Sequence, residues 1–311
     1  VGNFRVNLFR QRGQSAVVIR LISTDIPSVK DLNLPPVLID LIMERRGLIL
    51  VVGATGSGKS TTMAAMIEHR NLNRTGHILT VEDPIEFTFR HRRSLVNQRE
   101  VGIDTLSYSN ALVNAMREAP DVMMIGEVRE RETFRHALIY AQTGHLCLTT
   151  LHANNSYHCF NRIVNFFPHD ARQALLADMS ASLRAIISQR LVRGKDGKLL
   201  PAVEVMLNTK FVGELITKGE FDSIKEAMEQ SLSPGSQTFE QALFRLLQDG
   251  RITREEAMAS ADSPSNLAAL IDYAERPPSG VGVNAPAAGA TRGGTSFQEI
   301  SIDAGLLDKK K

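Results

Sequence analysis

The segment Gly53-Ala54-Thr55-Gly56-Ser57-Gly58-Lys59-Ser60 decides the fold of this chain. It fits the pattern G-x-x-x-x-G-K-[ST], which is the phosphate loop of nucleotide-binding proteins. The apolar run 48–52 before it predicts a buried strand, and residues 61–69 after it predict a helix. A strand, loop and helix in this order aim backbone N–H groups and the positive end of the helix at one anion. The alternative is a glycine-rich turn without a ligand.

The side chains of this loop predict a site for a nucleotide and a metal ion. The Lys59 ammonium can reach the β- and γ-phosphates, and the Ser60 hydroxyl can bind Mg²⁺. The residues expected to hold the nucleotide are Thr55, Gly56, Ser57, Gly58, Lys59, Ser60 and Thr61.

The composition predicts a protein of the cytoplasm. The 311 residues carry a formal net charge of +2, which argues against nucleic acid or an anionic membrane as the main partner. There is no signal peptide and no apolar run long enough to cross a bilayer. We therefore expect no direct membrane insertion, and any membrane contact to go through another protein. Because the chain opens with Val1, we also expect an N-terminal segment to be missing.

The chain divides into five stretches. Residues 1–26 hold two apolar segments that predict a β-hairpin, the end of a sheet whose earlier strands are absent. Residues 27–36 contain three prolines and predict a linker. Strands and helices alternate between 37 and 209, which indicates a mostly parallel sheet covered by helices. Residues 210–274 predict a helical C-terminal extension, and 275–311, rich in Pro, Gly and Ala, predict a disordered tail.

Four predicted strands of the 37–209 core end in reactive residues. One runs into the phosphate loop, and the other three end at Glu82, Glu127 and His152. Ligands bind beyond the carboxyl ends of the strands in open α/β sheets, so we expect these ends to form one site. Glu127 has the form of an acid that holds Mg²⁺, although buried strands often end in a charge.

The other polar residues near these strand ends leave two interpretations open. The acids Glu82, Asp83 and Glu86 either supply a general base for the attacking water or form a solvated turn. His145 and His152 flank one strand at odd spacing, so a straight strand points them to opposite faces. Each is either a structural histidine or part of a polar network that senses phosphate. The basic residues after Glu127 are assigned by default to a solvated face: Arg129, Arg131 and Arg135.

Taken together, these runs resemble the motifs of the ATPases that drive type IV pili and type II secretion. The four motifs occur in order over roughly 100 residues, and the resemblance extends from Phe4 to about Asp272. The matching segments are VGATGSGKSTTMAA (52–65) for Walker A, TVEDPIEF (80–87) for the aspartate box, REAPDVMMIGEVRERETF (117–134) for the Walker B region and TGHLCLTTLHANNS (143–156) for the histidine box.

The resemblance implies a specific fold and chemistry. The fold would be a RecA-like P-loop NTPase core, preceded by the end of a PAS-like N-terminal domain. The activity would be hydrolysis of ATP, with Mg²⁺ as cofactor, by a homo-hexamer. By motif position, Glu86 would be the catalytic base and Glu127 would hold Mg²⁺ through water. His145 and His152 belong to the histidine box and are carried as further catalytic candidates.

The resemblance also assigns a role to the N-terminal hairpin. Arg5 and Arg20 match the end of the family's N-terminal domain, where arginines approach the γ-phosphate. Without the resemblance they would be two exposed strand arginines. The family further implies a platform protein of the inner membrane as a partner and a peripheral location on the cytoplasmic side.

Within the family, the chain is most similar to the retraction, or twitching-motility, branch of PilT and PilU. The four-cysteine zinc motif common in assembly and type II secretion relatives is missing. The signature that PilT-like motors carry after a Leu-Asn-Thr segment is absent, since Leu207-Asn208-Thr209 is followed by KFVGELITKGE. This favours a PilU-like motor that powers or assists retraction with a PilT-like partner. The alternatives are an assembly or secretion ATPase, a regulatory subunit with weak hydrolysis, and a RecA-like nucleic-acid motor.

Overall fold

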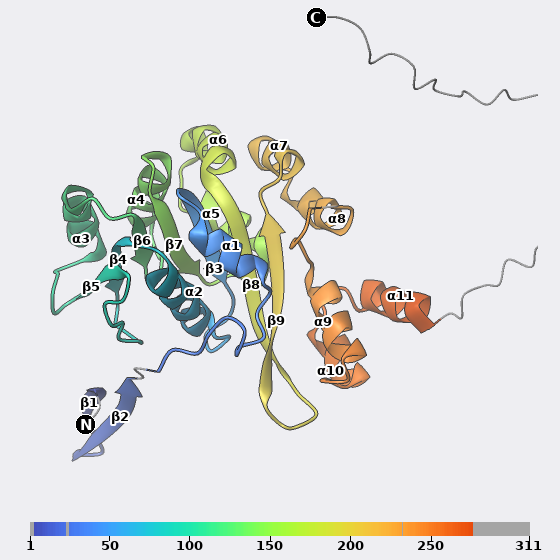
Figure 1. Ribbon diagram of the computed structural model, residues 1–311, viewed down its shortest axis with the longest axis horizontal. Helices are drawn as coiled ribbons and strands as arrows, with labels where there is room; N and C mark the ends of the chain where they lie inside the picture. The colour runs from blue at the N-terminus through green and yellow to red at the C-terminus, as the bar shows by residue number, and fades with distance from the viewer. Residues whose placement is uncertain (1–2, 23–24, 232, 276–311) are drawn as a thin grey trace, which may run out of the picture. The chain divides into compact units, whose positions relative to one another are not determined.

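The computed structural model describes residues 3–22, 25–231 and 233–275, and its centre is a seven-stranded sheet between two layers of helices (Figure 1). The strand order is β5-β4-β6-β7-β3-β8-β9. This arrangement confirms the predicted α/β fold with a mostly parallel sheet. The strands are β3 (Gly47–Val52), β4 (Gly76–Glu82), β5 (Ser94–Glu100), β6 (Val122–Ile125), β7 (Leu146–Leu151), β8 (Leu183–Arg193) and β9 (Leu199–Leu207).

Six of the seven strands run parallel, and β9 runs antiparallel to β8. Strand β3 lies between β7 and β8, and β4 lies between β5 and β6. The carboxyl ends of β3, β4, β6 and β7 therefore share one edge of the sheet. This is the edge at which the polar residues after the predicted strands were expected to meet.

Alternation along β3 separates the two faces of the sheet. Leu48, Leu50 and Val52 belong to a core that includes side chains of α3 to α8, whereas Ile49 and Val51 pack with α1 and α2. Figure 1 shows α1 and α2 together on the near face. A strand covered on both faces requires apolar residues at every position, which is why residues 48–52 form an unbroken run. The helices of these layers are α1 (Val37–Met43), α2 (Lys59–Asn73), α3 (Tyr108–Ala115), α4 (Arg131–Gln142), α5 (Ser156–Asn165), α6 (Arg172–Ser182), α7 (Lys210–Lys218) and α8 (Ile224–Glu229).

The C-terminal helical region packs in two separate places. Helices α7 and α8 join the large core, while the last three helices form a smaller core with β8 and β9. In that smaller core, Phe239 and Leu243 pack with Val192 and Leu200. Its helices are α9 (Phe239–Gln248), α10 (Arg254–Ser260) and α11 (Pro264–Glu275).

The N-terminal residues form the predicted hairpin, made of β1 (Asn3–Gln11) and β2 (Gln14–Ile22). Arg12 and Gly13 turn the chain with positive φ angles of 49° and 78°, a geometry that suits a two-residue hairpin loop. In the segment predicted to be a linker, Val29 and Leu34 are buried in the core that also contains side chains of α1 and α2. The predicted tail, apart from Glu275 at the end of α11, lies outside the described residues.

Candidate active site

The phosphate loop connects the buried strand β3 to helix α2. Gly58 precedes the first turn of the helix in a left-handed conformation with φ of 87°, which favours glycine. Residues 54–56 are exposed at the tip, while Ser57 and Lys59 are buried. The 15-residue helix begins at Lys59, so its positive end lies directly behind the loop. An anion seated on residues 55–61 would meet both backbone N–H groups and the helix terminus.

Lys59 is the buried cation of this loop. Its side chain is 8% exposed, and its Nζ donates to the carbonyl oxygens of Gly53 at 3.0 Å and Ala54 at 2.8 Å. Burial lowers the pKa of Lys59, while the charges of Glu127 and Glu86 act to raise that pKa. The two carboxylates that come from different strand ends therefore both act on the same ammonium.

Ser57 provides a test of whether the loop suits a phosphate. Its hydroxyl is buried and makes no hydrogen bond within the part of the chain that the structure describes. Buried hydroxyl groups in proteins are nearly always hydrogen-bonded, so an unpaired one inside a phosphate-loop motif fits a bound anion. Ser60 and Thr61 are half-buried at the start of α2, and the Ser60 hydroxyl is the type of hard oxygen ligand that Mg²⁺ prefers.

Backbone hydrogen bonds hold Glu127 at the edge of the sheet. The Gly126 N–H donates to the Val81 carbonyl at 2.8 Å, and the Val128 N–H donates to the Thr150 carbonyl at 2.9 Å. The Thr150 hydroxyl also donates to the Gly126 carbonyl at 2.7 Å. The turn after β6 is thus tied to β4 on one side and to β7 on the other. As a result, Glu127 lies between the aspartate box and the histidine box.

The Glu127 carboxylate lies between two basic side chains. His152 Nε2 is 3.0 Å from one oxygen, and the Arg129 guanidinium is 2.8 Å from the other. Arg129 also lies 3.7 Å from Asp83. The hydrogen bond and charge of Glu127 raise the pKa of Arg129 further. Arg129 was assigned to a solvated face from the sequence, and its position two residues after Glu127 was the only available signal that it could belong to the site.

The acid that ends β4, Glu82, and the two acids of the turn after it have different surroundings. Glu82 is buried and accepts hydrogen bonds from Thr80 Oγ1 at 2.7 Å and Gln98 Nε2 at 3.3 Å, and burial raises its pKa. Asp83 is turned toward Arg129. Glu86 is exposed, and among the described residues its side chain makes no hydrogen bond or ion pair. Glu86 is therefore the acid of this turn that is free to accept a proton from a water molecule.

His145 is not brought to this site. It lies just before the first residue of β7, at the end of the strand opposite to His152. Its Nδ1 is 3.1 Å from Thr143 Oγ1, and its ring packs edge-on against Tyr140 with centroids 5.6 Å apart. The odd spacing of the two histidines indicated opposite faces of the strand, but the six-residue strand also separates them along its length. We therefore leave His145 out of the proposed catalytic set.

Arg5 and Arg20 lie directly across from each other in the N-terminal hairpin. Both are exposed, and neither makes an ion pair within the described residues. An approach of these arginines to a γ-phosphate stays a prediction.

Gln189 of β8 also belongs to the phosphate-loop environment. It is 4% exposed, and its Nε2 donates to the Ser57 carbonyl at 2.8 Å. The two residues are 132 positions apart, and no motif predicts their contact. Only the placement of β8 beside β3 brings them together.

Two other features are absent from the described part of the chain: a cluster of metal ligands and a helix that could cross a membrane. Residues 3–22, 25–231 and 233–275 contain no cluster of three or more His, Cys, Asp or Glu side chains arranged to hold a metal ion. None of the described helices has both the length and the apolar character needed to cross a bilayer.

Comparison with known proteins agrees with the motifs. Residues 3–235 match the family of type II/IV secretion system proteins. The chain is 51% identical over 272 residues to the type IV pilus ATPase PilU of Pseudomonas aeruginosa, a match that covers 87% of this chain and 71% of the relative. It also resembles the crystal structure of the pilus retraction motor PilT with bound ADP, with a TM-score of 0.81 and 42% identity over 86% of this chain and 77% of that one. Similarity to type II secretion system protein E of Xanthomonas campestris is 36% over 156 residues, covering 50% of this chain and 26% of the relative.

Proposed function

The chain belongs to the type II/IV secretion system protein family, and from that premise we propose that it hydrolyses ATP to power or assist the retraction of type IV pili. The observation that carries the proposal is the buried Lys59 ammonium inside a phosphate loop that joins β3 to the start of α2. The charges of Glu127 and Glu86, which follow neighbouring strands, act on this ammonium, and such a set of charges is what phosphoryl transfer to water requires.

The residues divide the work of hydrolysis between them. The backbone N–H groups of residues 55–61 and the Lys59 ammonium would bind the phosphates and stabilise the negative charge that develops on them. Glu86 would orient a water molecule and accept its proton as the oxygen attacks the γ-phosphorus. The bond between the γ-phosphorus and the oxygen that links it to the β-phosphate would break, and the products would be ADP and inorganic phosphate. Mg²⁺, held by the Ser60 hydroxyl and through water by Glu127, would neutralise phosphate charge.

His152 and Arg129 would hold Glu127 in place. Both touch its carboxylate, so that neither oxygen turns away from the phosphate loop. Arg129 is 62% exposed and forms a surface ion pair, which rearranges at little cost. His152 is therefore the better candidate for sensing the nucleotide through Glu127.

Assignment to the retraction branch rests on the extent of the similarity. The matches with PilU and PilT cover more than two thirds of those proteins, whereas the match with the type II secretion protein covers about a quarter of its length. Identity is also higher with PilU than with PilT, at 51% against 42%. We therefore favour a PilU-like motor over an assembly or secretion ATPase.

The assembly and partners follow from the same proposal. The working form would be a homo-hexamer, in which Arg5 and Arg20 approach the γ-phosphate. Its partners would be a PilT-like retraction ATPase and the pilus platform protein of the inner membrane. The protein would be cytoplasmic and peripheral to that membrane. The near-neutral net charge of +2 does not support a nucleic-acid motor.

The proposal is tested by measuring ATP turnover with and without a purified PilT-like partner. We expect the chain to hydrolyse ATP by itself. The PilT-like partner should change the rate of hydrolysis, and DNA should not. Binding of ATP without turnover, even with the partner present, would support the regulatory-subunit alternative. DNA-stimulated turnover would instead support the nucleic-acid motor.

A cellular experiment separates a helper from an independent motor. In a strain that lacks its PilT-like motor, this protein supplied alone should not restore pilus retraction. Robust retraction in that strain would show that the chain retracts pili by itself.

A further inference from the structure

Gln189 of β8 contacts both the phosphate loop and the helix α2 that follows it, and no sequence motif predicts these contacts. Its Nε2 donates to the Ser57 carbonyl at 2.8 Å, and its Oε1 accepts a hydrogen bond from Thr62 Oγ1 at 2.6 Å. Ser57 lies in the loop, and Thr62 lies in the first turn of α2. Both contacts are buried. A single amide on β8 thus spans the loop and the helix that follows it.

The loop also approaches Gln189 too closely to leave room for side chains. A Cβ atom on Gly58 would lie 2.7 Å from Gln189 Nε2. A Cβ atom on Gly53 would overlap the Gln189 carbonyl oxygen. The first and sixth residues of the phosphate-loop motif therefore both pack on the same residue of β8. This explains two of the motif's glycines by contact with β8 as well as by contact with phosphate.

Chemistry fixes the orientation of this amide. The Ser57 carbonyl can only accept a hydrogen bond, so the nitrogen of Gln189 must face the loop. Its oxygen then faces Thr62, whose hydroxyl must donate. Thr62 is 1% exposed and Gln189 is 4% exposed, so water does not compete for these groups. An isosteric apolar side chain would leave the Ser57 carbonyl unpaired and the loop free to shift.

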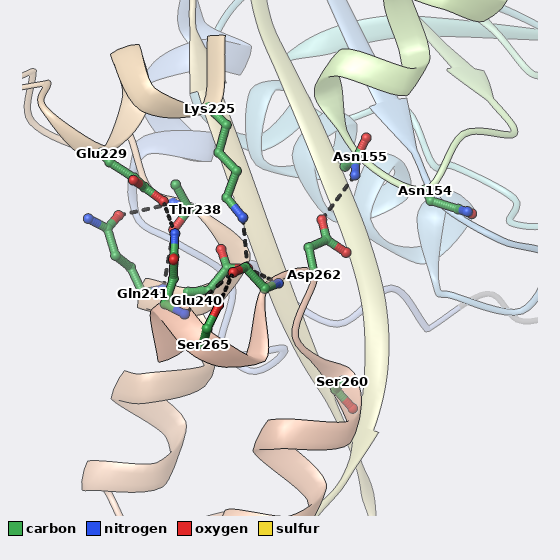
Figure 2. A network of polar contacts seen from close by, with 12 residues as sticks. Asn154, Asn155, Lys225, Glu229, Thr238, Glu240, Gln241, Ser260, Asp262 and Ser265 are labelled. Carbon is green, nitrogen blue, oxygen red and sulfur yellow. Dashed lines mark hydrogen bonds and ion pairs between the residues drawn. The ribbon is translucent and has the colours of Figure 1, made fainter. Parts of the chain in front are cut away.

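The neighbouring residue on β8 holds the strand from the opposite side. Arg190 donates to the Ser260 carbonyl at 2.7 Å and to Asp262 at 2.8 Å, and its guanidinium lies 3.7 Å from the centre of the Phe239 ring. Figure 2 shows Asp262 also joined to Asn155, which lies just after β7. Gln189 is thus carried by a strand that is itself fixed by the C-terminal helices.

We infer that Gln189 is a positioning residue for ATP hydrolysis, holding the phosphate loop in the geometry that phosphoryl transfer needs. This rests on the proposed function. A loosened loop would still offer its N–H groups and Lys59 to a phosphate, so ATP would bind. The phosphate would be less accurately aligned with its attacking water, and misalignment of about 1 Å can lower a rate by about 10²-fold.

The test compares two glutamines in the full-length protein. Gln189→Met removes the amide and keeps the volume. Gln237→Met is the matched control, because Gln237 is 7% exposed, donates to the Val203 carbonyl at 2.7 Å and accepts from Arg245 at 3.0 Å, all outside the phosphate-loop contacts. For each variant, kcat and KM for ATP, the equilibrium Kd for ATP and the Tm are measured.

For Gln189→Met we expect kcat to fall by about 10- to 100-fold, with a Kd for ATP within about threefold of wild type. Gln237→Met should lower the Tm by about as much as Gln189→Met does, and its kcat should stay at the wild-type value. A wild-type kcat in Gln189→Met, or an equal loss of kcat in both variants, would overturn the inference. If the wild-type protein hydrolysed no ATP, the proposed function would be wrong, and this inference would fail with it.

Thr62 provides a second pair of variants if Gln189→Met does not fold. Thr62→Val removes the hydroxyl that donates to Gln189, and Thr62→Ser keeps it. We expect Thr62→Val to lower kcat in the same direction as Gln189→Met and Thr62→Ser to retain most of it. Equal kcat values in the two Thr62 variants would contradict the inference.

Discussion

The two halves of the candidate site are held in different ways. On the phosphate-loop side, Lys59, Thr62 and Gln189 are each at most 8% exposed and are fixed by hydrogen bonds to backbone or to one another. On the acidic side, Glu86 is exposed and Arg129 is 62% exposed. Buried hydrogen bonds are costly to break, whereas exposed ion pairs are screened by salt and rearrange readily. We therefore expect the first half to bind the nucleotide, and Glu86 and Arg129 of the second half to be free to adjust during catalysis.

The largest effect is expected from Lys59→Ala. This change removes the charge that meets the phosphates in both the ground state and the transition state. ATP binding should weaken, and turnover should fall on the order of 10³-fold. Lys198→Ala removes an exposed lysine of the β8–β9 turn and serves as a control for the loss of charge. Wild-type turnover in Lys59→Ala would mean that the loop does not hold the reacting phosphate.

Glu86→Gln should show the next largest loss. The amide keeps the shape of the side chain and removes the base, so turnover should fall by roughly 10²-fold or more. Glu82→Gln is the control, because Glu82 ends β4 just before the same turn but is buried and accepts hydrogen bonds from Thr80 and Gln98. If Glu82→Gln lost turnover and Glu86→Gln did not, the assignment of the base would move to Glu82.

Arg20→Ala should lower turnover by about tenfold with little change in ATP affinity, because a guanidinium near the γ-phosphate stabilises charge that develops in the transition state. Arg5→Ala is expected to act in the same direction. Arg10→Ala changes another exposed arginine of the same hairpin and should have no effect. An equal loss of binding and turnover in Arg20→Ala would indicate that the arginine stabilises the hairpin, and no loss in either would leave it a surface residue.

The smallest effect on turnover is expected at Glu204, a buried acid of β9. Its carboxylate accepts from the Ser156 N–H and the Ser188 hydroxyl, each at 2.9 Å, and burial raises its pKa. Because the pKa is raised in the folded state, the stability contributed by the protonated form is present at low pH and is lost as pH rises. Glu204→Gln is neutral throughout, so its Tm advantage over wild type should grow from pH 5 to pH 8 while kcat stays unchanged. A Tm difference independent of pH would argue against burial as the cause.

The sequence predicted the phosphate-loop side of the candidate site better than the acidic side. The phosphate loop is one continuous segment, so its strand, turn and helix could be recognised from residues 48–69. Glu127 and His152 could be placed at one edge because both follow strands of a parallel sheet. Their actual contact, 3.0 Å between His152 Nε2 and a Glu127 oxygen, depends on the order of β6 and β7 in the sheet.

The features that escaped prediction depend on contacts between distant segments. Gln189 meets Thr62 across 127 positions, because β8 lies beside β3. Strand β5 ends in four consecutive polar residues, Asn97 to Glu100, and Gln98 among them donates a hydrogen bond to the Glu82 carboxylate. The prolines near residues 27–36 indicated a linker, but the Ser28–Asp31 hydrogen bonds fold this segment so that Val29 and Leu34 reach the core.

The difference between the two halves is tested most directly by equilibrium titration of ATP into Glu86→Gln, beside wild type and Lys59→Ala. If the buried half binds and the exposed half catalyses, Glu86→Gln should bind ATP with the wild-type Kd. Lys59→Ala should bind at least about tenfold more weakly. Equal losses of affinity in the two variants would contradict the account, because they would show that binding and hydrolysis depend on the same residues.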